Sequence, residues 1–132
     1  MYLLDTNILL FVAYRPEYLT EEVKAIVQGV DNELYFSAAS IWEVSIKFAL
    51  NKPDFNINPD ELRTGLFDNG FKELVIKGEH ALNVLHLPEL FHKDPFDRLL
   101  VAQAHYEGLT FITSDNNIIA LSGEFISLIP NR

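Results

Sequence analysis

Short, mostly apolar segments alternate along the chain with segments whose apolar positions recur at helical spacing. The short segments predict five β-strands, at Tyr2–Leu4, Leu34–Phe36, Phe71–Ile76, Leu109–Thr113 and Glu124–Leu128. Near-continuous apolar strands are typical of a sheet that is covered by helices on both faces. The strand pattern therefore favours a buried, mostly parallel sheet.

The segments between these strands carry helix start and stop signals. Thr20 is an N-cap candidate followed by two acids, and Asn58 is followed by Pro59 and by Glu61 three residues after the cap. The expected helices cover Thr6–Ala13, Thr20 to about Gln28, Ser37 or Ser40 to about Leu50, Asn58 to near Gly70, Glu79–Leu87, Asp94–Gly108, and a short stretch from Asp115 or Asn116. Strands separated by helices imply crossover connections, so the fold class is α/β.

The 132 residues, of which 48% are hydrophobic, match the size and core content of one domain covering residues 1–132. The Asn- and Pro-rich stretch Asn51–Pro59 indicates a surface loop within that domain. The apolar run Ile8–Tyr14 is far shorter than the roughly 18 residues of a membrane span, and the start of the chain does not resemble a signal peptide. We therefore expect a cytoplasmic protein without a membrane partner.

Several kinds of chemistry are excluded by missing residues and motifs. The chain has no cysteine, so it has no disulfide, thiolate nucleophile or thiolate zinc site. It has neither a Gly-rich dinucleotide motif nor a Walker lysine motif. His80 and His86 are six residues apart and do not share a helical face, and Ser114 has no evident His and Asp partners. The acidic residues are the remaining candidates.

The formal charge of −9 and the pI near 4.7 bear on possible partners. An acidic protein is repelled by the phosphates of nucleic acids at long range. A nucleic-acid function would need a bound cation or a local basic patch. The same acidity is equally consistent with solubility alone.

Four acids are expected at one edge of the predicted sheet. Asp5 follows the first strand, Asp115 follows the fourth, and Glu43 lies a few residues beyond the second. Asp97 lies in the first turn of the helix that Asp94 begins and that leads into the fourth strand. Ligands of parallel sheets bind at the carboxyl ends of the strands, so these acids mark a candidate crevice.

Each acid also has a purely structural interpretation. Asp5, Asp94 and Asp115 are favourable N-cap residues. Glu43 fits a capping box with Ser40, or an i,i+4 ion pair with Lys47. These interpretations stay open for each residue taken singly.

The four acids taken together are harder to explain by capping. At about 5 Å and an effective dielectric near 20, each carboxylate pair repels by roughly 3 kcal/mol. No cluster of Arg or Lys in the sequence offsets that repulsion. Raised pKa values or a bound hard dication would relieve it. An oxygen-only ligand set favours Mg²⁺ or Mn²⁺ over zinc.

Four segments resemble, in order and spacing, the motifs of PIN domains in the branch of VapC-like bacterial toxins. They are Tyr2–Asn7, Ser37–Val44 with Lys47, His92–Ala104 and Thr113–Asp115. One such motif would be weak evidence, whereas four that span almost the whole chain are specific. The resemblance implies a three-layer α/β/α sandwich around a short, mostly parallel sheet.

The resemblance also implies an activity and partners. PIN-domain toxins are Mg²⁺-dependent endoribonucleases that leave 5′-phosphate and 3′-hydroxyl ends. They are held inactive by a cognate antitoxin and are commonly homodimers. A bound Mg²⁺ or Mn²⁺ would activate water and would supply the positive charge that phosphate binding requires.

Site residues follow from the resemblance position by position. The catalytic, metal-binding acids of the family fall on Asp5, Glu43, Asp97 and Asp115. The polar residues around them fall on Thr6, Asn7 and Thr113, and the longer third motif of this branch adds Asp94 and Arg98. Many close relatives carry His where this chain has Asn7, which implies a different polar environment beside the first acid.

Two alternative functions stay open. The first is a PIN-like interaction module without catalysis, although the intact set of acids speaks against it. The second is a receiver-type phosphoacceptor domain, which needs two adjacent acids after the first strand, whereas Asp5 is followed by Thr6. A haloacid-type phosphatase is disfavoured because Asn7 stands where its second Asp is required.

Overall fold

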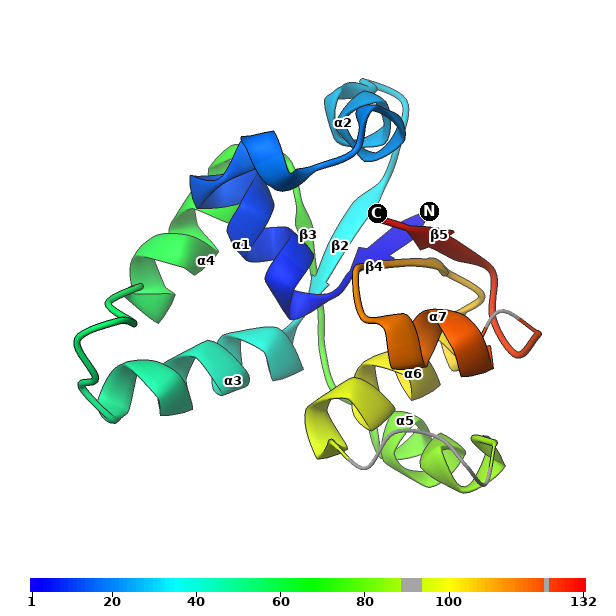
Figure 1. Ribbon diagram of the computed structural model, residues 1–132. Coiled ribbons are helices and arrows are strands. Elements are labelled where there is room, and N and C mark those ends of the chain that lie inside the picture. Colours follow the sequence, from blue (N-terminus) through cyan, green and yellow to red (C-terminus); the bar gives the residue numbers. More distant parts are fainter. Residues whose placement is uncertain (89–93, 123) are drawn as a thin grey trace.

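Five parallel strands form the central sheet, in the order β3-β2-β1-β4-β5 (Figure 1). The computed structural model describes residues 1–88, 94–122 and 124–132. Its strands are β1 (Tyr2–Leu4), β2 (Leu34–Ser37), β3 (Lys72–Leu74), β4 (Thr110–Thr113) and β5 (Leu128–Pro130). This strand order differs from the 2-1-3-4-5 order of receiver-type domains, which removes the phosphoacceptor alternative.

Helices connect every pair of consecutive strands. They are α1 (Thr6–Tyr14), α2 (Glu21–Gln28), α3 (Ala38–Ala49), α4 (Pro59–Asp68), α5 (Gly78–Asn83), α6 (Pro95–Glu107) and α7 (Asn116–Ser122), with the short 3₁₀ helices η1 (Pro16–Tyr18) and η2 (Val84–His86). No helix in the described ranges is long and apolar enough to cross a membrane.

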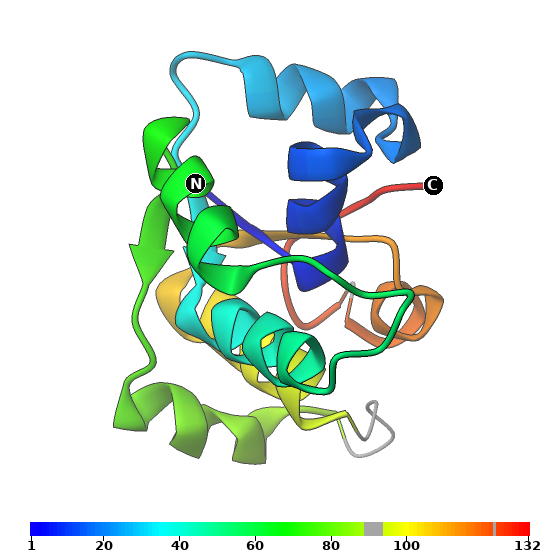
Figure 2. The same cartoon turned by 90° about the vertical axis from the view of Figure 1, so that its left-hand side faces the viewer.

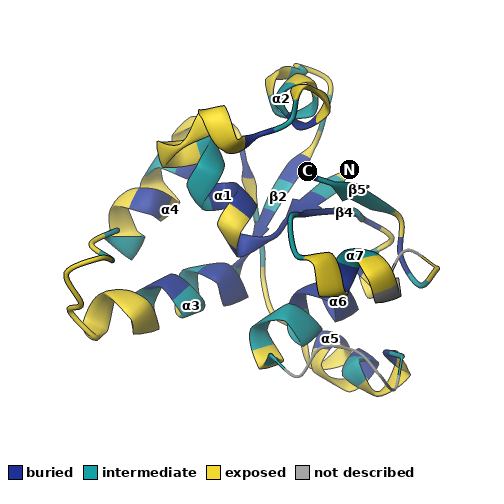
Figure 3. Cartoon of the chain, in the orientation of Figure 1, coloured by how far each residue is buried: buried dark blue, intermediate teal, exposed yellow. Residues whose placement is uncertain are grey.

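The helices form one layer on each face of the sheet, as a three-layer α/β/α sandwich. Alternate strand residues point to opposite faces, so Leu4 and Ile112 join a core with α1, α2 and α4, whereas Leu3 and Phe111 join a core with α6 and α7. Figure 2 shows the two groups of helices on opposite sides of the strands. Figure 3 shows that the central strands of the sheet are largely buried, and these are β2, β1 and β4. The predicted fold class is confirmed.

Helix α3 lies at the edge of this sandwich and packs against helices of both layers. It contacts both α4 and α6, and it contributes Val44 to one core and Ala39 to the other. The helix begins directly after β2, because the Ser37 side chain accepts a hydrogen bond from the Ala39 N–H at 3.0 Å. Glu43 on this helix is therefore held at the carboxyl end of the sheet.

Most predicted elements are confirmed, and four expectations need correction. The last strand is Leu128–Pro130, because Ile126 turns into the second core before the chain pairs with β4. The third strand is limited to Lys72–Leu74. The helix expected over Glu79–Leu87 divides into α5 and η2, and Leu87, which precedes Pro88, is extended. The capping box of Ser40 with Glu43 is wrong, because Ser37 caps α3.

Candidate active site

A pocket of about 240 Å³ lies at the carboxyl ends of the strands. It contains all four predicted catalytic acids and most of the predicted polar neighbours. Its lining residues are Asp5, Thr6, Asn7, Glu43, Lys47, Asp94, Asp97 and Asp115. Strands β1 and β4 are adjacent although they are far apart in sequence, and the chain leaves them toward opposite layers. Such a switch point is where parallel sheets form ligand crevices.

Asp5 is the most deeply buried of these acids, with only 5% of the residue exposed. Its Oδ1 accepts a hydrogen bond from the Thr6 N–H at 2.8 Å, and its Oδ2 accepts one from the Thr113 hydroxyl at 2.7 Å. Burial raises the pKa of Asp5 from 3.8 to about 6, against the lowering effect of these two hydrogen bonds. The negative charges of Glu43 and Asp115 raise it further.

The Thr113 side chain hydrogen-bonds to both Asp5 and Asp115. It is fully buried, and its hydroxyl oxygen accepts the Asp115 N–H at 3.0 Å while its proton goes to Asp5. Asp115 in turn caps α7, because its Oδ1 accepts the N–H groups of Asn117 at 2.8 Å and Ile118 at 3.2 Å. Thr113 is therefore a support beneath the pocket and is not part of its lining.

Asp94 and Asp97 enter the pocket from the start of α6. Asp94 is the N-cap, and its Oδ1 accepts the N–H groups of Phe96 at 2.9 Å and Asp97 at 3.3 Å. Asp97 lies in the first turn, where a negative charge interacts favourably with the helix dipole. Arg98 is half-buried on the same helix and is not among the residues that line the pocket.

Glu43 enters from the body of α3. Its side chain is 16% exposed, and its Oε2 lies 3.3 Å from the Nζ atom of Lys47, which confirms the predicted i,i+4 pair. One turn earlier, the buried Ser40 hydroxyl accepts the Thr6 hydroxyl proton at 2.8 Å. That bond ties α3 to the start of α1 and so fixes Glu43 relative to Asp5.

Sequence reasoning did not identify Lys47 as a pocket residue, although the spacing with Glu43 was visible. It also missed the buried link between the helices that carry Glu43 and Asp97. Ser37 at the start of α3 donates to the Gln103 side chain of α6 at 2.6 Å, and both residues are fully buried. The available signal was Gln103, a polar residue inside an apolar stretch of a predicted helix. The first two residues of the third motif, His92 and Lys93, lie outside the described residues.

The pocket chemistry suits a hard cation, because the described residues that line it supply five carboxylates, two further oxygen-bearing side chains and a single lysine. Within the described part of the chain, however, no three acidic or histidine side chains have the spacing of a formed metal centre. The carboxylates share one pocket without meeting at one point, as their mutual repulsion favours. The donor set therefore fits Mg²⁺ or Mn²⁺ in kind.

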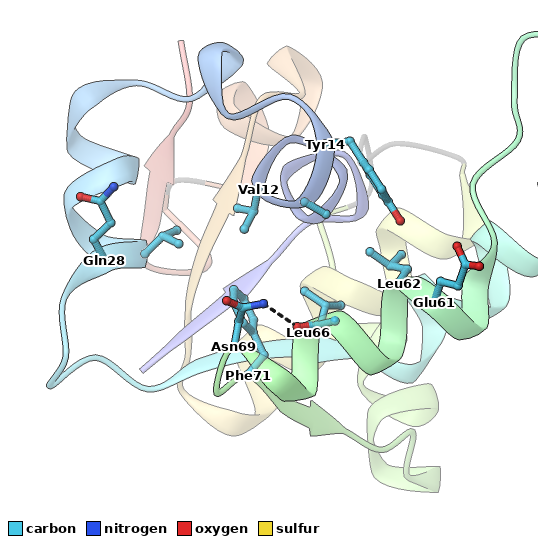
Figure 4. Close-up of a pocket in the computed structure, with 11 residues that line it drawn as sticks. Val12, Tyr14, Gln28, Glu61, Leu62, Leu66, Asn69 and Phe71 are labelled. Carbon is cyan, nitrogen blue, oxygen red and sulfur yellow. Dashed lines mark hydrogen bonds between the residues drawn. The ribbon is translucent and has the colours of Figure 1, made fainter.

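A larger pocket of about 490 Å³ lies between α1, α2 and α4, where side chains of the three helices face one another (Figure 4). Its lining is mixed, with Val12, Leu62 and Phe71 beside Gln28 and Glu61. Among the residues that the structure describes, Glu61 is the only acidic one in this lining. This pocket lacks the group of carboxylates that defines the candidate active site.

The family model of the PIN domain matches residues 2–124. The chain therefore belongs to the PIN domain family. No curated protein sequence matches the chain. The family match covers all four motifs that carried the resemblance, and it includes each of the acids in the pocket.

Solved structures with the same fold include three protein complexes. The chain is similar to VapBC2 from Rickettsia felis bound to a promoter DNA fragment, with a TM-score of 0.72, 13% identity, and coverage of 99% of this chain and 98% of that chain. It is similar to FitAB bound to an IR36 DNA fragment, with a TM-score of 0.70, 19% identity, and coverage of 98% and 94%. It is also similar to DNA-bound VapBC from Salmonella typhimurium, with a TM-score of 0.68, 14% identity, and coverage of 98% and 96%. At these identities the likeness shows the shared fold.

Proposed function

We propose that residues 1–132 form one nuclease domain, a metal-dependent endoribonuclease that acts as the toxin of a toxin–antitoxin pair. The observation that carries the proposal is the pocket that Asp5, Glu43, Asp97 and Asp115 line together at the carboxyl edge of a PIN-domain sheet. These four acids come from four different elements or their ends. They are the proposed catalytic residues.

The four acids would hold Mg²⁺ or Mn²⁺. When bound, such an ion lowers the pKa of a coordinated water and neutralises charge on the phosphoryl oxygens of RNA. Asp5 is oriented by Thr6 and Thr113, and Asp97 is held in the first turn of α6. A carboxylate of the set would accept the proton of the attacking water.

Thr6, Asn7, Asp94, Arg98 and Thr113 are the proposed supporting residues. Thr113 hydrogen-bonds Asp5, and Thr6 links the start of α1 to α3. Asp94 aims the first turn of α6 toward the pocket. Arg98 has the least structural support for such a role, because it does not line the pocket.

We expect the chain to bind a cognate antitoxin and to form a homodimer. A toxin–antitoxin complex from Klebsiella pneumoniae has the same fold as this chain, with a TM-score of 0.64 and 19% identity. Five carboxylates in one pocket favour a partner segment that inserts Arg or Lys among them. Co-purification from the native operon, with light scattering of the free and bound chain, tests both expectations.

The activity is tested with purified protein and structured RNA, in Mg²⁺, in Mn²⁺ and in EDTA. We expect cleavage only with metal, and none by the Asp97→Asn variant. Asp68→Asn is the matched control, because Asp68 is exposed at the end of α4, away from the pocket lining. Cleavage in EDTA or by Asp97→Asn would contradict the proposal, and a folded wild type without activity would favour the interaction-module alternative.

A further inference from the structure

Lys47 is the one cationic side chain that lines the acidic pocket within the described residues. It lies one helical turn beyond Glu43 on α3, and its Nζ atom is 3.3 Å from Glu43 Oε2. The same Nζ atom lies 6.0 Å from the centre of the Phe55 ring, in the loop that follows α3. The lysine thus stands at the wall of the pocket, between the acids and the loop before α4.

The two members of this ion pair differ in accessibility. The Lys47 side chain is 46% exposed, whereas the Glu43 side chain is 16% exposed. An i,i+4 pair with an exposed member contributes little and does not fix a long lysine chain in one position. The ammonium group can therefore reach a ligand at the pocket mouth while Glu43 stays inside.

The charge of the site gives this lysine a distinct role. The chain carries a formal charge of −9, and the pocket has five carboxylates. An RNA phosphate that approaches the pocket meets a negative field, which a cation at the mouth offsets locally. A lysine ammonium is a compact charge with three rotatable donors and is well suited to a phosphate oxygen.

We propose that Lys47 is a substrate-binding residue that contacts a phosphate oxygen of the RNA at the mouth of the pocket. This inference rests on the proposed ribonuclease function and adds to it a residue that the family's acidic site does not include. The competing explanation is that Lys47 only balances the charge of Glu43.

The salt dependence of RNA binding separates these two explanations. Each phosphate contact on single-stranded nucleic acid adds about 0.7 to the slope of log affinity against log salt. Binding is measured by fluorescence anisotropy with a short dye-labelled single-stranded RNA, over a KCl series at one low Mg²⁺ concentration. All chains carry Asp97→Asn, which is expected to prevent cleavage of the probe.

Lys47→Met is expected to weaken binding roughly tenfold to a hundredfold at low salt and to reduce the slope by about 0.7. Lys47→Arg keeps a cation and should keep the slope. Lys24→Met is the matched control, because Lys24 pairs with Glu21 at 3.4 Å on a helix outside the pocket and its loss changes net charge equally. Thermal melting confirms that each variant folds.

An unchanged slope for Lys47→Met overturns the proposal. Tighter Mn²⁺ binding by a Lys47→Met variant that retains Asp97, measured without RNA, then assigns Lys47 to balancing the charge of Glu43. An equal loss of slope in Lys24→Met also overturns it, because the effect would then come from net charge. If the Asp97→Asn reference does not bind RNA and the wild type does not cleave it, both this inference and the proposed function fail. Binding with an unchanged slope defeats this inference alone.

Discussion

Replacing Asp5 with Asn should stabilise the metal-free protein at neutral pH. Burial raises the pKa of Asp5 from 3.8 to about 6, so the folded state holds this proton more tightly than the unfolded chain. One pKa unit is worth about 1.36 kcal/mol, so ionised Asp5 lowers the free energy of unfolding at pH 7.5 by about 3 kcal/mol. An Asn at this position carries no charge and escapes that cost.

The substitution also changes one hydrogen bond. An Asn Oδ1 still accepts the Thr6 N–H and caps α1. The Thr113 hydroxyl loses its acceptor, because an amide NH₂ replaces Oδ2, at a cost of about 1–2 kcal/mol. We therefore expect a net gain of about 1–2 kcal/mol at pH 7.5 in metal-free buffer, several degrees in melting temperature.

The pH dependence isolates the charge from the lost hydrogen bond. The folded state binds more protons than the unfolded chain between pH 3.8 and 6, so the wild type loses stability as pH rises through this range. The Asp5→Asn variant lacks this loss. Its stability relative to wild type should improve by about 2 kcal/mol between pH 4 and pH 7.5.

Urea unfolding of wild type and Asp5→Asn, in metal-depleted buffer at several pH values, measures this difference. Asp60→Asn is the control, because Asp60 is exposed in the first turn of α4. Mg²⁺ should then stabilise the wild type more than the variant, by mass action. A stability difference that does not vary with pH would show that Asp5 carries no burial cost, and the reasoning would fail.

Three further substitutions test other parts of the structure. Thr113→Val removes the donor that lowers the Asp5 pKa, so Asp5 should take up its proton at a higher pH in the variant. As the pH is lowered, Mn²⁺ affinity measured by calorimetry should therefore begin to fall at a higher pH in the variant than in the wild type. Gln103→Leu removes the acceptor of the buried Ser37 hydroxyl proton and one of the hydrogen-bond partners of the buried His80 ring, and should cost about 1–3 kcal/mol in urea unfolding. Gly108→Ala places a side chain at φ 68°, where α6 ends, and should lower stability by about 1 kcal/mol in thermal melting.

Local signals predicted the elements that carry the site. The apolar segment before Asp5 gave β1, and the pairs Asn58-Pro59 and Asp94-Pro95 gave the starts of α4 and α6. The expectation of a parallel sheet also predicted that the acids lie at one edge, and that prediction did not require the strand order. The signal placed the last strand too early, over Glu124–Leu128, because Ile126 is apolar for packing into a core, whereas the strand begins only at Leu128.

The contacts that hold the acids in place could not be predicted, because they join residues far apart in sequence. Thr113 contacts Asp5 across 108 positions, Gln103 contacts Ser37 across 66, and Thr6 contacts Ser40 across 34. Each pairs short or flexible polar side chains that have many alternative partners. Strand order and helix orientation decide between those partners, and neither is visible in local spacing.

Capping a helix does not keep these acids out of the candidate active site. Asp5, Asp94 and Asp115 each cap a helix through Oδ1, and each lines the same pocket. A capping hydrogen bond uses one of about four acceptor positions on a carboxylate. It therefore fixes the orientation of the carboxylate and leaves the other acceptor positions available. Glu43, which enters from the middle of α3, is instead paired with Lys47. Because Asn preserves the cap, loss of metal binding in a folded Asp→Asn variant can be assigned to the lost carboxylate and not to a lost cap.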